Sequence, residues 1–165
     1  MVTYEWWRGK LLIYGFNVAR KNIAASSLKV GDESMSAISF QTTAEGNLPH
    51  MSYIFRKPEP LGTEFKTVYC YVTGDLLFIE AQRGKEGMKH SKYQKDLGST
   101  SACTKGMAEA TKGIVQKYRK GVTKDYFLFD SWLSSKKAAE SDMEVGAELI
   151  GMVKINTKVF CKETI

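Results

Sequence analysis

The sequence lacks the features that mark a secreted or membrane-spanning protein. No apolar run approaches the roughly 18 residues that a membrane span requires. Residues 1–8 carry an acid and two tryptophans before a short apolar run, which is unlike a signal peptide. We therefore expect an intracellular protein with no membrane partner, and a nuclear one if it acts on DNA.

Cysteine and histidine are also scarce, which argues against a disulfide framework and a zinc site. The three cysteines, Cys70, Cys103 and Cys161, lie far apart and form no CxxC pair. The two histidines, His50 and His90, are isolated and provide no ligand pair near them. A reduced compartment is the simpler expectation.

Proline is rare, and the remaining composition is that of a folded domain. The chain has 3 prolines among 165 residues, of which 43% are hydrophobic and 25% are charged. A single domain of this length buries roughly two-thirds of its unfolded surface, which is enough for an independent core. The net charge of +6 permits a polyanionic partner such as nucleic acid without requiring one.

The periodicity of apolar residues predicts a mixture of helices and strands. Trp7, Leu11, Tyr14 and Val18 share one helical face, so residues 1–25 are predicted to form a leading helix. The other predicted elements are strands at 28–31, 65–72, 76–81, 126–129 and 148–155, helices at 104–121 and 134–145, and loops at 41–50 and 83–101. This order predicts an α/β protein of the mixed α+β kind, in which helices cover a mixed sheet. The ribonuclease H-like fold is one such arrangement, and periodicity alone does not select it.

Two aspartates follow predicted strands. Asp32 comes after residues 28–31, and Asp130 comes after residues 126–129. A carboxylate at a strand end is held by a rigid sheet yet faces solvent, so two of them can converge on one divalent cation. The alternative is that each aspartate forms a turn or caps a helix. Glu33 would point to the opposite side of the strand and is interpreted either as a support for the metal ligands or as structural.

Other polar and aromatic residues are assigned ordinary structural roles. Asp75 belongs to a predicted hairpin turn and Asp125 opens a predicted strand, so both are expected to be solvated. Ser134 is the expected N-cap of the last helix, and Gly146 is its expected terminator. The three tryptophans are expected to lie in the core: Trp6, Trp7 and Trp132.

Several blocks of the sequence resemble the transposase domains derived from piggyBac elements. The segment Val-Gly-Asp-Glu-Ser-Met-Ser at 30–36 is similar to the "DES-M" block of that family. Further blocks at 48–66, 129–135 and 151–156 keep the order and approximate spacing of the family. Each block alone is weak, but together and in order they are specific, and they span residues 17 to 156 almost continuously.

This resemblance implies a ribonuclease H-like domain that cuts and rejoins DNA with three aspartates and two divalent cations, Mg²⁺ or Mn²⁺. By the same resemblance Asp32 is the first catalytic and metal-binding aspartate, and Asp130 is the second. The third acid of the family lies beyond the strand that matches 149–155, on a helix after a further insertion. Because the chain has only two of these three acids, we expect the isolated chain to be inactive.

The resemblance therefore predicts one partial catalytic domain, incomplete at the C-terminus, over residues 1–165. The leading helix takes residues 1–25, the ribonuclease H-like core takes 26–156 and a tail takes 157–165. The implied partner is the DNA of transposon ends, and pairing with a second copy or with a complete transposase stays open.

Three basic residues in the second block are candidate DNA contacts. Arg56, Lys57 and Lys66 surround a Pro-x-Pro turn, where they are able to reach backbone phosphates without reading sequence. The alternative is an ordinary solvated loop.

Two other functions stay open at this stage. The chain is either catalytically active in a larger context or a catalytically dead, domesticated module that binds DNA or protein. The run 127–130 also resembles the nucleophile strand of haloacid dehalogenase-like phosphatases. Those enzymes require a second aspartate two residues later, where this chain has Trp132.

Overall fold

The computed structural model describes residues 6–20, 22–23, 25–37, 51–55, 57–82, 100–112, 114 and 124–152. These residues form three helices and six strands. In chain order the elements are α1 (Trp6–Arg20), β1 (Leu28–Ala37), β2 (Ser52–Tyr53), β3 (Leu61–Cys70), β4 (Leu76–Ala81), α4 (Thr100–Thr111), β5 (Asp125–Phe129), α5 (Lys136–Glu144) and β6 (Ala147–Gly151).

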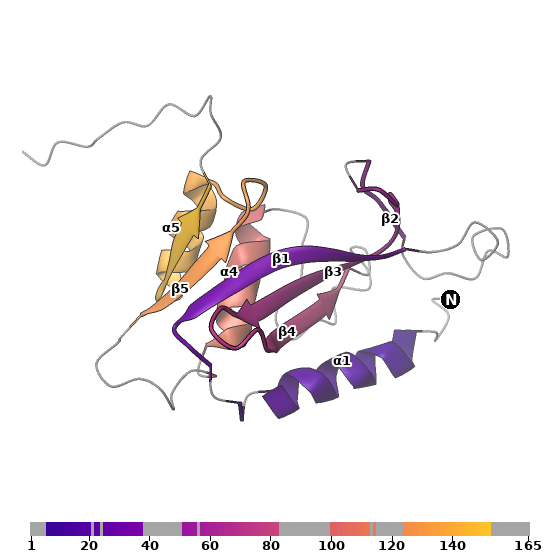
Figure 1. Ribbon diagram of the computed structural model, residues 1–165, viewed down its shortest axis with the longest axis horizontal. Helices are drawn as coiled ribbons and strands as arrows, with labels where there is room; N and C mark the ends of the chain where they lie inside the picture. Colours follow the sequence, from indigo (N-terminus) through magenta and orange to yellow (C-terminus); the bar gives the residue numbers. More distant parts are fainter. Residues whose placement is uncertain are drawn as a thin grey trace, which may run out of the picture.

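The six strands form one mixed sheet. Its order is β2-β3-β1-β5-β6, and β4 pairs with β3 beside this path. Strand β3 runs antiparallel to β1, β2 and β4, whereas β1, β5 and β6 run parallel to one another. Helices α4 and α5 pack together and lie against one face of this sheet (Figure 1). The mixed sheet covered by helices is thus confirmed.

Strand β1 lies in the middle of the sheet and separates two chemical faces. Lys29, Gly31 and Glu33 are buried on the side of α4, whereas Asp32 and Ser34 are exposed on the other side. This alternation follows from the two-residue period of a strand. Glu33 therefore points away from Asp32, as expected from the sequence.

The core lies between the sheet and helix α4. The rings of Phe127 and Phe129 on β5 stack with centroids 5.8 Å apart, and Met107 from α4 is buried with them. Met107 and Ile114 lie within the segment 104–121 that the sequence predicts to be helical, and both are buried. The apolar side of α4 thus fixes the helix against the sheet, where it contacts β3 and β4.

Helix α1 lies beside the edge strand β4 (Figure 1). The side chain of Asn17 joins the two elements. The Asn17 amide nitrogen donates to the backbone oxygen of Ile79 at 2.8 Å, and its oxygen accepts from the Ile79 N–H at 3.1 Å. The predicted apolar stripe does not make this contact, because Leu11, Tyr14 and Val18 are exposed by 61%, 51% and 42%. Asn17 covers part of an edge that would otherwise present free backbone groups.

Several element boundaries differ from the sequence prediction. Ser135, not Ser134, is the N-cap of α5, and its Oγ accepts from the Ala138 N–H at 3.1 Å. Gly146, at φ 82°, follows the C-cap of that helix and ends it as predicted. The hairpin of β3 and β4 is confirmed. The predicted loop at 41–50 and most of the one at 83–101 lie outside the described residues, although Thr100 already begins α4.

Candidate functional site

Asp32 and Asp130 each directly follow the last paired residue of two adjacent strands. Strands β1 and β5 are parallel, and their register pairs Gly31 with Phe129. The next residues along the two chains are Asp32 and Asp130, and adjacent strands are roughly 4.8 Å apart. Both aspartates are exposed. The sheet therefore places two exposed aspartates at neighbouring backbone positions.

Asp32 lies inside a strand rather than at its end. Strand β1 continues for five residues beyond it, because β3 pairs with β1 as far as Ala37. Oδ1 of Asp32 accepts from the Glu33 N–H at 2.7 Å, and its backbone oxygen accepts from the Thr67 hydroxyl at 3.1 Å. At Asp32 the strand pairs with Thr67 of β3, whereas its pairing with β5 ends one residue earlier, at Gly31.

Asp130 directly follows the last residue of β5. Its Oδ1 accepts from the N–H groups of Trp132 and Leu133, both at 3.0 Å. Its backbone oxygen accepts from the Ser134 hydroxyl at 2.7 Å. Asp130 therefore forms a turn through one carboxylate oxygen, and both bonds fix the orientation of its side chain.

Gly31 allows β1 and β5 to pack closely next to Asp32 and Asp130. A Cβ atom added at Gly31 would lie 2.1 Å from Cε1 of Phe129 and 3.0 Å from Sδ of Met107. Side chains larger than hydrogen do not fit there without moving the ring or the helix. Gly31 and Phe129 thus set the packing directly beneath the two aspartates.

The chemistry of this pair suits a hard divalent cation. Carboxylate oxygens are the preferred ligands of Mg²⁺ and Mn²⁺, and Mg²⁺ commonly binds through one or two carboxylates plus water or phosphate oxygens. In the part of the chain that the structure describes, no three His, Cys, Asp or Glu side chains come together as a metal-binding group. Asp32 and Asp130 fit the role of two ligands, with the other positions left to water or substrate.

The candidate DNA contacts lie in a different environment from the one predicted. Lys66 is 4% exposed and forms ion pairs with Glu33 and Glu64. Burial lowers its pKa, but interactions with Cys103 and with both glutamates outweigh this effect and raise it. Because its charge is already paired beneath the surface, the geometry does not favour contact with DNA phosphates.

The structure describes one of the other two basic candidates, Lys57. Lys57 is half-buried, and its Nζ donates to the backbone oxygen of Glu33 at 3.0 Å. That bond ties the turn after β2 to strand β1 and leaves the charge near the surface. Arg56 lies outside the described residues.

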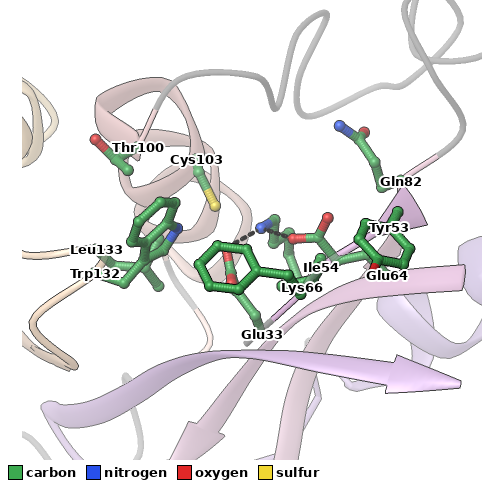
Figure 2. A pocket seen from close by; sticks show the side chains of 11 residues that line it. Glu33, Tyr53, Ile54, Glu64, Lys66, Gln82, Thr100, Cys103, Trp132 and Leu133 are labelled. Carbon is green, nitrogen blue, oxygen red and sulfur yellow. Dashed lines mark hydrogen bonds and ion pairs between the residues drawn. The ribbon is translucent and has the colours of Figure 1, made fainter. Parts of the chain in front are cut away.

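A cavity of about 350 Å³ adjoins the buried ion pairs. Figure 2 shows Trp132 and Leu133 on one side, Tyr53 and Gln82 on the other, and the ammonium of Lys66 between them. The sequence did not reveal this cavity, because its walls come from strands, a turn and a helix that are far apart in the chain.

Cys103 also lines the cavity but does not act as a nucleophile there. Burial raises the pKa of its thiol to about 12, even though Lys66 works in the opposite direction. The protonated thiol is a poor nucleophile near neutral pH. Cys103 is therefore a small apolar part of the wall.

Two sequence predictions about the burial of single side chains are wrong. Asp125, expected to be solvated, is buried with its Oδ2 3.2 Å from Nζ of Lys29. Trp132, expected in the core, is 51% exposed because the turn that Asp130 forms carries it to the surface. The sequence did contain a signal for the burial of Asp125. Lys29 lies within the apolar run 28–30, and a lysine that is buried there needs a carboxylate partner. The side chains of Trp6 and Trp7 lie outside the description.

Among the helices that the structure describes, none is both long enough and apolar enough to span a bilayer.

Comparison with known proteins identifies a similar fold but no matching sequence family. No protein-family model and no curated protein matches the chain. The chain is structurally similar to a piggyBac transposase seen by cryo-EM in a synaptic complex with hairpin DNA, with a TM-score of 0.55 and 15% sequence identity. The match covers 82% of this chain but only 24% of the other. At this identity the likeness shows the fold, and the expected ribonuclease H-like arrangement is confirmed.

Proposed function

We propose that this chain is a catalytic-domain unit of a piggyBac-type DNA transposase, in which Asp32 and Asp130 hold a divalent cation, Mg²⁺ or Mn²⁺. The observation that carries the proposal is the parallel register that makes these two exposed aspartates neighbours. The family blocks in the sequence and the structural likeness to a transposase bound to DNA support it.

The two aspartates would position the metal, and the metal would assist phosphodiester cleavage. A divalent cation at such a site activates an attacking oxygen or stabilises a leaving oxygen. Asp32 would contribute a ligand from a strand position paired with β3, and Asp130 would contribute one from a hydrogen-bonded turn. Because both face solvent, a DNA strand is able to reach them without a rearrangement of the sheet.

We expect the isolated chain to bind one cation weakly and not to cleave DNA alone. Two-metal cleavage needs more oxygen ligands than two aspartates provide. A further carboxylate from another segment or from a second protein would complete the site. DNA of transposon ends is the proposed partner, and the nucleus is the proposed location.

Titration with Mn²⁺ tests the metal site directly. In a ¹H–¹⁵N NMR spectrum the paramagnetic ion should broaden the signals of Asp32, Asp130 and their neighbours first. Asp32→Asn and Asp130→Asn should each abolish this broadening, whereas Asp75→Asn in the exposed β3–β4 turn should not. Broadening that is unchanged in both site variants would exclude the proposed ligands.

A nicking assay on supercoiled DNA tests the expected inactivity. The parent chain should leave the plasmid intact in Mn²⁺. Nicking by the parent that disappears in both Asp32→Ala and Asp130→Ala would show that two aspartates suffice here, and the expectation of inactivity would be withdrawn.

A second candidate is a catalytically inactive module that binds another protein. The observation in its favour is the stripe of Leu11, Tyr14 and Val18, which α1 presents to solvent. If this function holds, Leu11→Ser with Val18→Ser should abolish a complex seen by sedimentation, while Asp32→Asn leaves it intact.

A further inference from the structure

Ser134 closes the turn that follows β5. Because Ser135 caps α5, the hydroxyl of Ser134 is not used at the start of that helix. Instead it donates to the backbone oxygen of Asp130 at 2.7 Å, and the Ser134 N–H donates to the same oxygen at 3.0 Å. The hydroxyl also lies 3.3 Å from the backbone oxygen of Phe129. One side chain thus joins the end of the turn to the end of the strand.

The closed turn determines where the carboxylate of Asp130 points. Its Oδ1 accepts from the N–H groups of Trp132 and Leu133, which lie in the middle of the turn. The side chain of Leu133 is buried in the core and is only 1% exposed. The turn is therefore anchored at Leu133 and closed at Ser134. Since both donors to Oδ1 are backbone groups of this turn, a change in its closure moves the carboxylate.

Ser134 packs against a glycine of the neighbouring strand. Gly151 is the last residue of β6 and pairs with Phe129, the residue before Asp130. A Cβ atom added at Gly151 would lie 2.0 Å from Oγ of Ser134 and 2.5 Å from its Cβ. The φ angle of Gly151 is not positive, so the close approach of Ser134, not the backbone conformation, explains glycine at this position. A side chain at 151 would displace Ser134.

The end of β5 thus lies between two glycines. Phe129 pairs with Gly31 of β1 on one side and with Gly151 of β6 on the other. Gly31 leaves room for the ring of Phe129, and Gly151 leaves room for the side chain of Ser134. Both close contacts occur directly beside Asp130. Strand β6 therefore supports the position of Asp130 although it contributes no candidate ligand.

We propose that Ser134 is a positioning residue for the metal site and that Gly151 holds it in place. The Ser134 hydroxyl closes the turn, and the turn fixes Oδ1 of Asp130. The hydrogen bonds of this carboxylate to the described residues use Oδ1, so Oδ2 is the oxygen that a cation would take. The inference rests on the proposed function for the identity of the ligand, whereas the support of the carboxylate is measurable without metal.

Amide hydrogen exchange in the metal-free chain tests the support. Ser134→Ala should speed the exchange of the Trp132 and Leu133 amides by about fivefold or more relative to amides of β1, which report the opening of the whole sheet. Gly151→Ala should have the same effect, because its methyl group displaces Ser134. Ser135→Ala is the matched control, since it removes the cap of α5 without a contact to Asp130, and it should leave this ratio unchanged.

Mn²⁺ titration followed by the broadening of ¹H–¹⁵N signals tests the consequence for the metal. Ser134→Ala and Gly151→Ala should each raise the dissociation constant by about fivefold or more. Ser134→Thr keeps the hydroxyl and should bind within about twofold of the parent. Ser135→Ala should bind as the parent does, even though the loss of a helix cap lowers the stability of the chain.

The two measurements separate this inference from the proposed function. Unchanged Mn²⁺ affinity in Ser134→Ala, or equal losses in Ser134→Ala and Ser135→Ala, would overturn the positioning role and leave the metal site standing. A parent chain that binds no Mn²⁺ would contradict the proposed function instead. Faster exchange in Ser134→Ala and Gly151→Ala alone would then still support the positioning of the Asp130 carboxylate, and unchanged exchange would overturn it.

Discussion

The ammonium of Lys29 lies 3.2 Å from Oδ2 of Asp125 and joins the beginnings of two parallel strands, β1 and β5. The same ammonium donates to the backbone oxygen of Thr111 at 3.0 Å, at the C-terminal end of α4. It also lies 5.3 Å from the ring centroid of Phe127. One fully buried lysine therefore connects β1, β5 and α4 at the end of the sheet away from the candidate metal site.

Lys29→Met should lower the free energy of unfolding by about 3–5 kcal/mol, because it leaves Asp125 buried without its partner. Urea denaturation followed by circular dichroism measures the loss. The double variant with Asp125→Asn should regain part of it. Lys136→Met serves as the control, since Lys136 pairs with Glu140 on the surface of α5 and should cost less than about 0.5 kcal/mol. Equal effects at Lys29 and Lys136 would contradict the prediction.

Asp142→Asn should stabilise the protein near neutral pH. Asp142 is fully buried in α5, and neither of its carboxylate oxygens has a hydrogen-bond partner of good geometry in the described residues. Burial raises its pKa from 3.8 to about 6, an effect that the Thr104 hydroxyl partly offsets. We expect a gain of about 1–3 kcal/mol from the substitution.

The pH dependence of stability distinguishes this effect from a general one. The folded state holds the Asp142 proton more tightly than the unfolded state does, so the carboxyl favours folding below pH 3.8 and this contribution is lost as the pH rises through about 6. Asp142→Asn should remove this part of the profile, and Glu140→Gln on the same helix should not. Parallel profiles for the parent and Asp142→Asn would exclude Asp142 as the cause.

Asn17→Ala should detach α1 from β4. The change removes both hydrogen bonds to Ile79 and should cost about 1–3 kcal/mol. It should also raise self-association in sedimentation experiments, because it exposes backbone groups at a sheet edge. Asn22→Ala, at an exposed position just after the helix, should change stability by less than about 0.5 kcal/mol. Similar losses in both variants would refute this role of Asn17.

Gly31→Ala should destabilise the sheet by about 1–3 kcal/mol, because the new methyl group would overlap the Phe129 ring. Since this packing lies beneath Asp32 and Asp130, the substitution should also weaken Mn²⁺ binding. Gly15→Ala in α1 meets nothing within 4 Å and should stabilise by about 0.5–1 kcal/mol. Thermal unfolding of the two variants gives the comparison, and a neutral Gly31→Ala would disprove the packing argument.

The sequence predicted the order of the elements because most of them have clear local patterns. The β3–β4 hairpin combines aromatic and β-branched runs with the turn at 73–75, and α4 carries an apolar stripe through Met107. The neighbouring placement of Asp32 and Asp130 follows once β1 and β5 are parallel and adjacent. The periodicity of apolar residues does not show which strands pair with each other. The prediction that these two aspartates act together came from the family resemblance.

What the sequence missed depends on contacts between distant segments. The length of β1 beyond Asp32 comes from pairing with β3, since residues 32–37 have no apolar run of their own. The burial of Lys66 comes from Glu33 on the neighbouring strand, at a directly opposed position. In the same way the exposure of Leu11 on α1 follows from the Asn17 contact, which outweighs the apolar stripe of the helix.

The hydrogen bonds between Asn17 and Ile79 make the two edges of the sheet differ in how readily a further strand can pair there. At β4 a side-chain amide takes the donor and the acceptor that a further strand would need, so an approaching strand must first displace a helix. At the opposite end β6 pairs on one side only among the described residues. Any strand that another segment or another protein adds to this domain should therefore join beside β6, in the parallel half of the sheet that carries Asp130.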